Sequence, residues 1–394
     1  MKKRRILVFL ALLPVVLGCP GEEVVKLGAV LPLTGEAAIY GLPVQRGVEL
    51  AFEHFQSQQD LPYQLELVVV DSESDPEKAK NLLIQVYRDG ALASIGGVTT
   101  AEALQMVAVA DEFDRVLISP SASTPQLSGI SKNFYRVFPS DAREGATMGN
   151  FATQKLKAEK VVILAKEDAY AKGIQQVFKT EFERYGGEVL DLIEFPSLGS
   201  ELSGLVERVM TLGPDAVYLA AYAADLAQMI KHLRDQGYKG TIFTTSAFAA
   251  PEIIAQVGRP AEGVFLTQAV FDIDSEDPVI RNFIDGYRAK YNLEPDLYAA
   301  HGYDSVMVLV EALRIGGRTS SELWKGIRSI RDFSGATGTV QFDERGDVQK
   351  FPRVYVVNEG VLVDYEAEVE RRRRELLERL RDLEKEQRRT RSGD

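Results

Sequence analysis

Short apolar runs alternate with amphipathic segments along most of the chain, and this alternation constrains the fold more than any other feature. The apolar runs are each short enough for one strand, and they cover residues 24–31, 65–70, 91–95, 116–118, 161–165, 188–194, 216–220, 241–244 and 263–267. Segments with helical periodicity lie between most of them, at 41–57, 76–87, 101–113, 170–184, 201–211 and 224–236. Nearly continuous apolar strands joined by helices are typical of parallel sheets covered on both faces.

The repeats fall into two series, and a chain of 394 residues is long enough for about two domains. Three helical stretches and a strand-rich end follow the second series, at 277–291, 297–314, 320–329, 337–342, 353–357 and 360–363. We therefore predict an α/β fold of two doubly wound, Rossmann-like lobes, each completed by a late return of the chain: 24–139 with 270–337, and 140–269 with 338–365. Three crossovers then join the lobes, near 139–141, 269–272 and 337–342.

Residues 1–18 are predicted to be a signal peptide. Basic residues at 2–5 precede an apolar run, Ile6 to Leu17, that is too short to cross a bilayer comfortably. The only cysteine, Cys19, ends a Val-Leu-Gly-Cys sequence that resembles a bacterial lipobox. We expect an exported protein on the periplasmic side or outer cell surface, anchored by a lipid on Cys19, with a linker at 19–23. An ordinary signal peptide with a coincidental cysteine is the alternative.

The last segment, 366–394, is nearly all charged and predicts a helical tail. Its few apolar residues recur at seven-, four- and three-residue spacing, at Val369, Leu376, Leu380 and Leu383. Two interpretations remain open: a solvated helix held by pairs of opposite charge, and a short coiled-coil contact with a protein partner.

Charge and composition exclude several classes of function. The net charge is −12, which disfavours a nucleic-acid partner because such partners require clustered positive charge. One cysteine cannot form a disulfide framework, and His54, His232 and His301 lie far apart in the sequence, so we expect neither a metal nor a cofactor. The chain has no GxSxG elbow, no P-loop and no GxGxxG after its first strand, and we predict a protein that is not an enzyme.

Candidate binding residues follow the strands, because ligands of open α/β sheets bind beyond the carboxyl ends of the strands. Thr99 and Thr100 open a helix after two glycines, and backbone N–H groups with hydroxyls at a helix N-terminus can bind an anion. The next strand leads into a second hydroxyl-rich turn, Ser119 to Pro125, which contains Ser121 and Ser123. Ordinary caps and turns have the same composition, so this pattern alone leaves both interpretations open.

Three tyrosines occupy comparable places. Tyr40 follows the first strand, while Tyr170 and Tyr222 follow strands of the second series. Aromatic rings that face hydroxyls across a cleft suit a small ligand with one polar and one apolar end. Core tyrosines that cover strand ends are the alternative.

Several motifs, in this order and spacing, carry a resemblance to a known family. They are the stretch from Gly28 to Gly35, Tyr40-Gly41, Arg46-Gly47-Val48, the segments 71–76 and 118–125, Gly302-Tyr303-Asp304 and the segment 342–347. In these motifs the chain resembles bacterial solute-binding proteins of the leucine/isoleucine/valine-binding type, over residues 24–365. The resemblance implies the type I periplasmic binding protein fold and hinged closure around one small solute. It also implies delivery of that solute to the membrane permease of an ABC importer.

The resemblance also assigns residues. Thr100, Ser121 and Ser123 would hold the carboxylate or another acceptor group of the ligand, with Tyr40 packed nearby. Tyr170 and Tyr222 would close over the ligand from the second lobe. Asp141 matches an acidic position beside the hinge.

One departure from the family pattern bears on the ligand. Amino-acid-binding relatives have an acidic residue after the strand at 241–244, which pairs with the ligand's α-ammonium. Here Ser246 and Ala247 occupy that stretch. Either Asp141 or another carboxylate replaces it, or the ligand is not an α-amino acid. A branched-chain amino acid, an amide and a small carboxylate all remain open as ligands. A different function also remains open: a sensor or interaction lipoprotein that regulates a protein partner such as the cell-wall machinery.

Overall fold

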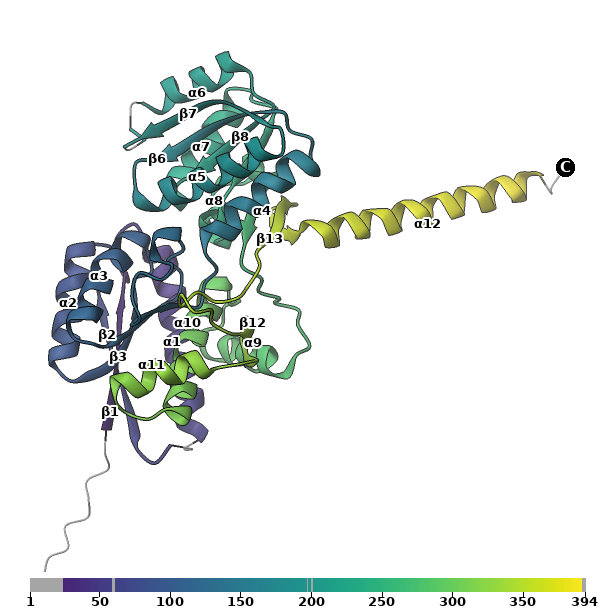
Figure 1. Ribbon diagram of the computed structural model, residues 1–394. Coiled ribbons are helices and arrows are strands. Elements are labelled where there is room, and N and C mark those ends of the chain that lie inside the picture. Colours follow the sequence, from purple (N-terminus) through teal and green to yellow (C-terminus); the bar gives the residue numbers. More distant parts are fainter. Residues whose placement is uncertain (1–23, 59–60, 197, 200, 392–394) are drawn as a thin grey trace, which may run out of the picture.

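The computed structural model describes residues 24–58, 61–196, 198–199 and 201–391. It contains two stacked lobes, and a long helix projects from one of them (Figure 1). The predicted signal peptide, the linker at 19–23 and Cys19 lie outside the described residues. None of the described helices is both long enough and apolar enough to cross a membrane.

The first lobe is built on a parallel sheet of five strands in the order β2-β1-β3-β4-β5. These strands are β1 (Val24–Leu31), β2 (Gln64–Asp71), β3 (Ala91–Gly96), β4 (Val116–Ser119) and β5 (Phe134–Arg136). Helices α2 (Pro76–Arg88) and α3 (Thr100–Glu112) share one apolar core with the sheet. The other face is covered by helices from two distant parts of the chain: α1 (Ala38–Gln58), α9 (Pro278–Tyr291), α10 (Leu297–Ile315) and α11 (Ser320–Ser329).

The late return of the chain is fixed by close packing between α1 and α10. A Cβ atom on Gly47 would lie 1.9 Å from the carbonyl oxygen of Ala299, and one on Gly302 would lie 2.4 Å from the carbonyl oxygen of Val44. Only glycine fits at such distances, so two of the motifs that carry the family resemblance are sites where two helix backbones touch.

The second lobe has seven strands in the order β14-β13-β10-β9-β8-β6-β7. Its parallel strands are β6 (Lys160–Lys166), β7 (Glu188–Phe195), β8 (Ala216–Ala220), β9 (Thr241–Thr244) and β10 (Val264–Gln268). The chain returns once more to add β13 (Arg353–Asn358) and β14 (Val361–Asp364), which are antiparallel to their neighbours. The helices of this lobe are α4 (Asp141–Gln154), α5 (Ala169–Arg184), α6 (Leu202–Leu212), α7 (Ala223–Asp235) and α8 (Pro251–Val257).

The predicted fold class is confirmed, with corrections to its details. The segment predicted as a strand at 337–342 contains the strand β12 (Gly338–Val340), but this strand pairs with β11 (Phe333–Gly335) in a separate hairpin and joins neither large sheet. Residues up to 347 still contact the first sheet, because Arg136 N–H donates to the Gly346 carbonyl at 3.1 Å and Arg136 bridges to Asp347. The third connection therefore lies farther along the chain than the predicted boundary between 337 and 338.

The tail forms α12 (Tyr365–Arg391), and beyond its first turns it projects away from both lobes (Figure 1). Pairs of opposite charge along the helix stabilise it, such as Arg371 and Glu375 at 2.6 Å. The four apolar residues that the sequence singled out are exposed: Val369, Leu376, Leu380 and Leu383.

Candidate functional site

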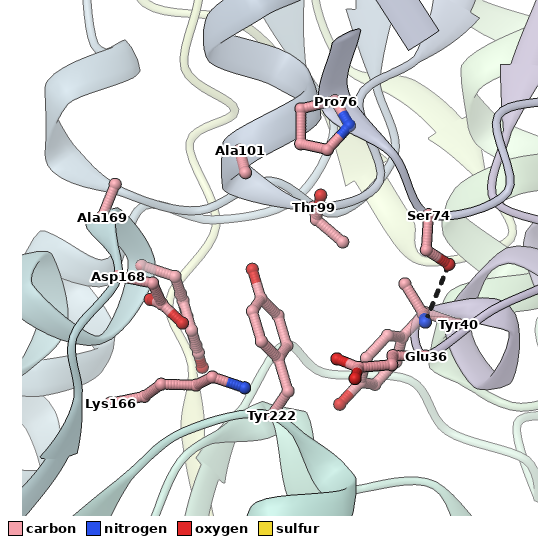
Figure 2. Close-up of a pocket in the computed structure, with 12 residues that line it drawn as sticks. Glu36, Tyr40, Ser74, Pro76, Thr99, Ala101, Lys166, Asp168, Ala169 and Tyr222 are labelled. Carbon is pink, nitrogen blue, oxygen red and sulfur yellow. Dashed lines mark hydrogen bonds between the residues drawn. The ribbon is translucent and has the colours of Figure 1, made fainter. Parts of the chain in front are cut away.

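The carboxyl ends of both sheets face each other, and a cavity of about 190 Å³ lies between the lobes (Figure 2). We call it the outer chamber. The first lobe contributes Glu36, Ser74 and Thr99 to its wall, and the second contributes Lys166 and Asp168. Tyr222 projects into it from the second lobe. Many of these residues lie at or just before a helix start, because each helix begins where its strand ends at this edge of the sheet.

A second cavity of about 30 Å³, which we call the inner chamber, lies against Tyr40, Tyr170 and Tyr222 as well. The wall contains eight of the nine binding residues predicted from the sequence: Tyr40, Thr100, Ser121, Ser123, Tyr170, Tyr222, Ser246 and Ala247. Val98, Ala122, Phe138 and Tyr298 complete it. The structure thus gathers residues from both lobes at one place, although they are spread over 259 positions of the sequence from Tyr40 to Tyr298.

The hydroxyl-rich turn of the first lobe is held from behind by a buried arginine. The guanidinium of Arg136 donates to the Thr124 carbonyl at 2.9 Å, to Ser128 Oγ at 2.6 Å and to Asp347 Oδ1 at 2.7 Å. Its side chain is 0% exposed. A planar fork with several donors can fix a turn in one conformation, and here it fixes the turn that contains Ser123.

The N-terminus of α3 is capped by its own residues, and one buried hydroxyl beside the cap has no partner among the described residues. Thr99 and Glu102 form a reciprocal capping box, with both side-chain to backbone distances at 3.3 Å. The next residue, Thr100, is buried, and its hydroxyl has no hydrogen-bond partner among the described residues. This unpaired hydroxyl lies in the wall of the inner chamber, at the positive end of a helix dipole.

Four tyrosine rings enclose the inner chamber. Tyr170 and Tyr222 stack with ring centroids 5.0 Å apart, and Tyr40 and Tyr298 also lie 5.0 Å apart. Burial raises the pKa of all four phenols, so each stays neutral well above pH 7. For Tyr222, the Thr100 backbone N–H partly opposes this rise in pKa, so the Tyr222 hydroxyl of the second lobe lies close to the start of α3 in the first.

The segment after β9 is bound by both lobes. Tyr40 Oη donates to the Ala247 carbonyl at 3.0 Å and accepts from the Ala223 N–H at 2.8 Å. Tyr298 Oη donates to the Ser246 carbonyl at 3.0 Å. Because Tyr40 and Tyr298 belong to the first lobe, these bonds hold the lobes together across the cleft.

A carboxylate that the sequence analysis did not single out supports this segment. Glu144 accepts from the Ser246 N–H at 2.7 Å, from Ser246 Oγ at 3.0 Å and from Thr267 Oγ1 at 3.3 Å. Burial, together with the nearby Asp141, raises the pKa of Glu144 to about 8.

Asp141 is the one predicted site residue that lines neither chamber. It lies directly behind Ser123, since its backbone N–H donates to the Ser123 carbonyl at 2.8 Å. Burial raises its pKa to about 7, against a lowering by the Ser123 hydroxyl and the charge of Arg136.

The charged side chains in the wall of the outer chamber are Glu36, Lys166 and Asp168. Lys166 pairs with Asp225 at 2.7 Å, and both side chains are largely buried. Asp168 caps α5 by accepting from the Ala171 N–H at 2.8 Å. Across the described residues, no three His, Cys, Asp or Glu side chains lie close enough together to bind a metal ion.

Sequence reasoning missed three residues of this region. Tyr298 and Phe138 lie in the inner wall, and Glu144 lies behind it. Tyr298 lies in the first turn of the long apolar helix α10. The apolar pattern of this helix does not distinguish a residue that lines a cleft from one that packs in the core. Phe138 immediately precedes the first crossover near 139–141. Because crossovers lie beside the cleft, this position could have indicated Phe138 as a wall residue.

Comparisons with known proteins agree with this arrangement. The family described as "Periplasmic binding protein" matches residues 24–358. A leucine binding protein LivK from Thermotoga maritima MSB8 is similar in structure, with a TM-score of 0.82 and 31% identity, over 86% of this chain and 97% of that one. A branched-chain amino acid transporter substrate binding protein LivJ from Streptococcus pneumoniae, in complex with isoleucine, has a TM-score of 0.80 and 26% identity, over 87% of this chain and 100% of that one.

The curated relatives include Leu/Ile/Val-binding protein homolog 3 from Brucella melitensis, which is 24% identical over 82% of this chain and 88% of the relative. These proteins are named for binding a solute and not for catalysis. The family match covers most of the sequence and both lobes. The chain belongs to the periplasmic binding protein family.

Proposed function

We propose that this protein is the solute-binding component of an ABC importer and that it binds one small amphipathic solute between its lobes. The observation that carries this proposal is the inner chamber, where neutral hydroxyl donors of the first lobe face aromatic rings contributed by both lobes. A polar end of the solute would accept from Thr100 at the N-terminus of α3 and from Ser123 in the turn after β4. Its hydrocarbon would lie against the tyrosines.

The relatives indicate the size of the solute. The printed names of LivK and LivJ describe leucine and isoleucine binding, and we propose a solute of similar size here. Branched-chain amino acids, short amides and small carboxylates form this class. In the described conformation the inner chamber holds little more than one water, so the solute must displace Tyr222 into or along the outer chamber.

Closure supplies the mechanism. The solute binds first to the hydroxyls and the helix N-terminus of the first lobe. Tyr170 and Tyr222 then cover it, and the exclusion of water strengthens each polar contact. A closed form favoured by the solute is the state that a permease can distinguish from the empty protein.

A thermal-shift screen tests this proposal. Purified protein would be heated with amino acids, short amides and aliphatic or aromatic acids, each at about a hundred times its Kd or at the solubility limit. We expect at least one solute to raise the melting temperature of the wild type and to lose that effect in Tyr222→Ala. Tyr185→Phe, an exposed tyrosine outside the cleft, is the matched control. A panel without any stabilising solute would contradict the proposal.

We also propose that a lipid on Cys19 anchors the protein in a membrane after export. Two acyl chains hold a protein stably at a bilayer. Cells grown with radiolabelled palmitate should yield labelled wild-type protein in the membrane fraction, and Cys19→Ala should be unlabelled and released. Equal labelling of both would contradict the anchor.

The sensor role has less support. Within the described part of the chain, the feature that supports it is the row of exposed apolar residues on α12, whereas the inner chamber gathers residues from both lobes. We therefore favour solute binding for import.

A further inference from the structure

The composition of the inner chamber restricts the charge of its ligand. Among the described residues that line it, none is acidic or basic. An ammonium group that enters a closed chamber loses its hydration, and it is stabilised there only by a carboxylate or by several free acceptors.

The acceptors at the second-lobe side of the chamber are already in use. The carbonyl of Ser246 accepts from Tyr298, and the carbonyl of Ala247 accepts from Tyr40, each at 3.0 Å. The Tyr40 oxygen accepts in turn from the Ala223 N–H at 2.8 Å. The protein's own phenol thus occupies the position from which an ammonium would donate.

The two nearby carboxyl groups do not replace an acid in the wall. Both oxygens of Glu144 already accept hydrogen bonds from Ser246 or Thr267. The two carboxyl oxygens of Asp141 are buried without a partner among the described residues, but Asp141 lies behind Ser123 and lines neither chamber. Burial raises the pKa of both carboxyl groups, which favours their neutral forms.

The free groups on the first-lobe side are donors. The Thr100 hydroxyl is buried and has no hydrogen-bond partner among the described residues, and the Thr100 N–H lies close to the Tyr222 hydroxyl. Both lie at the start of α3, where the helix dipole favours a negative group. A carboxylate supplies acceptors for these donors and brings no donor of its own.

We propose that the solute is a small monocarboxylate without an α-ammonium group, and that Tyr40 and Ala247 set this preference. This inference rests on the proposed function and narrows its ligand class. Tyr40 satisfies the Ala247 carbonyl and the start of α7 at once, so closure needs no positive charge from the solute.

Matched pairs of solutes test the inference by calorimetric titration of the purified protein. Each pair shares one hydrocarbon and differs only in the ammonium: 3-methylbutanoate and valine, 4-methylpentanoate and leucine, 3-phenylpropanoate and phenylalanine. In the pair whose hydrocarbon fits, we expect the acid to bind at least about tenfold more tightly than the amino acid. An amino acid that binds as tightly as its acid, or more tightly, would overturn the inference, whether or not Asp141→Asn abolishes that binding.

Two variants test whether Tyr40 and Ala247 set the preference for the acid over the amino acid. Tyr40→Phe frees the Ala247 carbonyl, and Ala247→Asp adds a carboxylate to the wall, so each should shrink the ratio of the two affinities severalfold. Tyr87→Phe is the matched control, because it removes a buried phenol that bonds Ser94 far from the cleft, and it should leave the ratio unchanged. A wild-type ratio that persists in both cleft variants would overturn the role of Tyr40 and Ala247. Binding by neither member of any pair would contradict the proposed function, and the inference with it.

Discussion

At the scale of single residues, the buried carboxyl group of Glu144 links the hinge side of the second lobe to the wall of the cleft. It holds Ser246 by two hydrogen bonds, and Ser246 in turn presents its carbonyl to Tyr298 across the cleft. Glu144 therefore acts on the cleft through Ser246, and we expect its effect on solute affinity to be indirect.

Glu144 also makes stability depend on pH. Burial raises its pKa to about 8, so the folded protein keeps a proton that the unfolded chain releases near pH 4. Stability from this group is therefore lost as the pH rises through about 8, and Asp141, with a pKa of about 7, acts in the same direction.

We predict that the melting temperature falls between pH 6.5 and 7.5 and that Glu144→Gln flattens this decline. The window avoids His301, whose pKa burial lowers to about 3, and Lys350, whose pKa burial lowers to about 8. Scanning calorimetry at several pH values measures the slope. Glu66→Gln, at an exposed position, serves as the control. A slope that is equal in wild type and Glu144→Gln would contradict this account.

At the scale of elements, the turn after β4 depends on Arg136, which forms a buried ion pair with Asp347 in a late segment of the chain. Breaking a buried pair leaves an uncompensated charge and costs about 3–5 kcal/mol. Arg136→Met should therefore lower the free energy of unfolding by about this amount in urea denaturation, and it should weaken solute binding because the turn at Ser123 loses its support.

Arg353→Met is the control for this prediction. Arg353 pairs with Asp364 at the surface with its side chain 64% exposed, and exposed pairs contribute about 0–1 kcal/mol. Equal losses of stability in the two variants would show that Arg136 has no special role.

The elements also show what the sequence can and cannot predict. Long apolar strands such as β1 and β8 are recognisable because both faces are buried. Helix α4 was not predicted because Gly145 and Gly149 are poor helix formers, yet both lie against the backbone of α5, where a larger residue would crowd Phe178 or Phe182. Strand β5 has only three residues and gives no periodic signal.

The residues of the site also divide into those that the sequence predicts and those that it does not. Eight wall residues could be predicted because they follow strands and match family motifs, whereas Tyr298 and Glu144 are brought to the cleft by helices that return from elsewhere. Its position in the sequence predicted that Asp141 would be a binding residue. Only the folded structure shows that Asp141 lies behind Ser123.

At the scale of the whole molecule, two lobes meet at one cleft through bonds that the protein makes with itself. Tyr40 and Tyr298 of the first lobe contact the segment after β9 in the second, and Tyr222 reaches back to α3. Because the Tyr222 hydroxyl lies close to the start of α3, we expect a solute that binds at Thr100 to displace this ring.

The most direct measurement is a crystal structure of the protein with the solute that gives the largest thermal shift. Our account predicts the solute between the lobes, with its acceptor end within hydrogen-bond distance of Thr100 and Ser123 and with the Tyr222 ring displaced from the start of α3. A solute bound outside the two chambers, or a cleft in which Tyr222 still contacts Thr100, would contradict it.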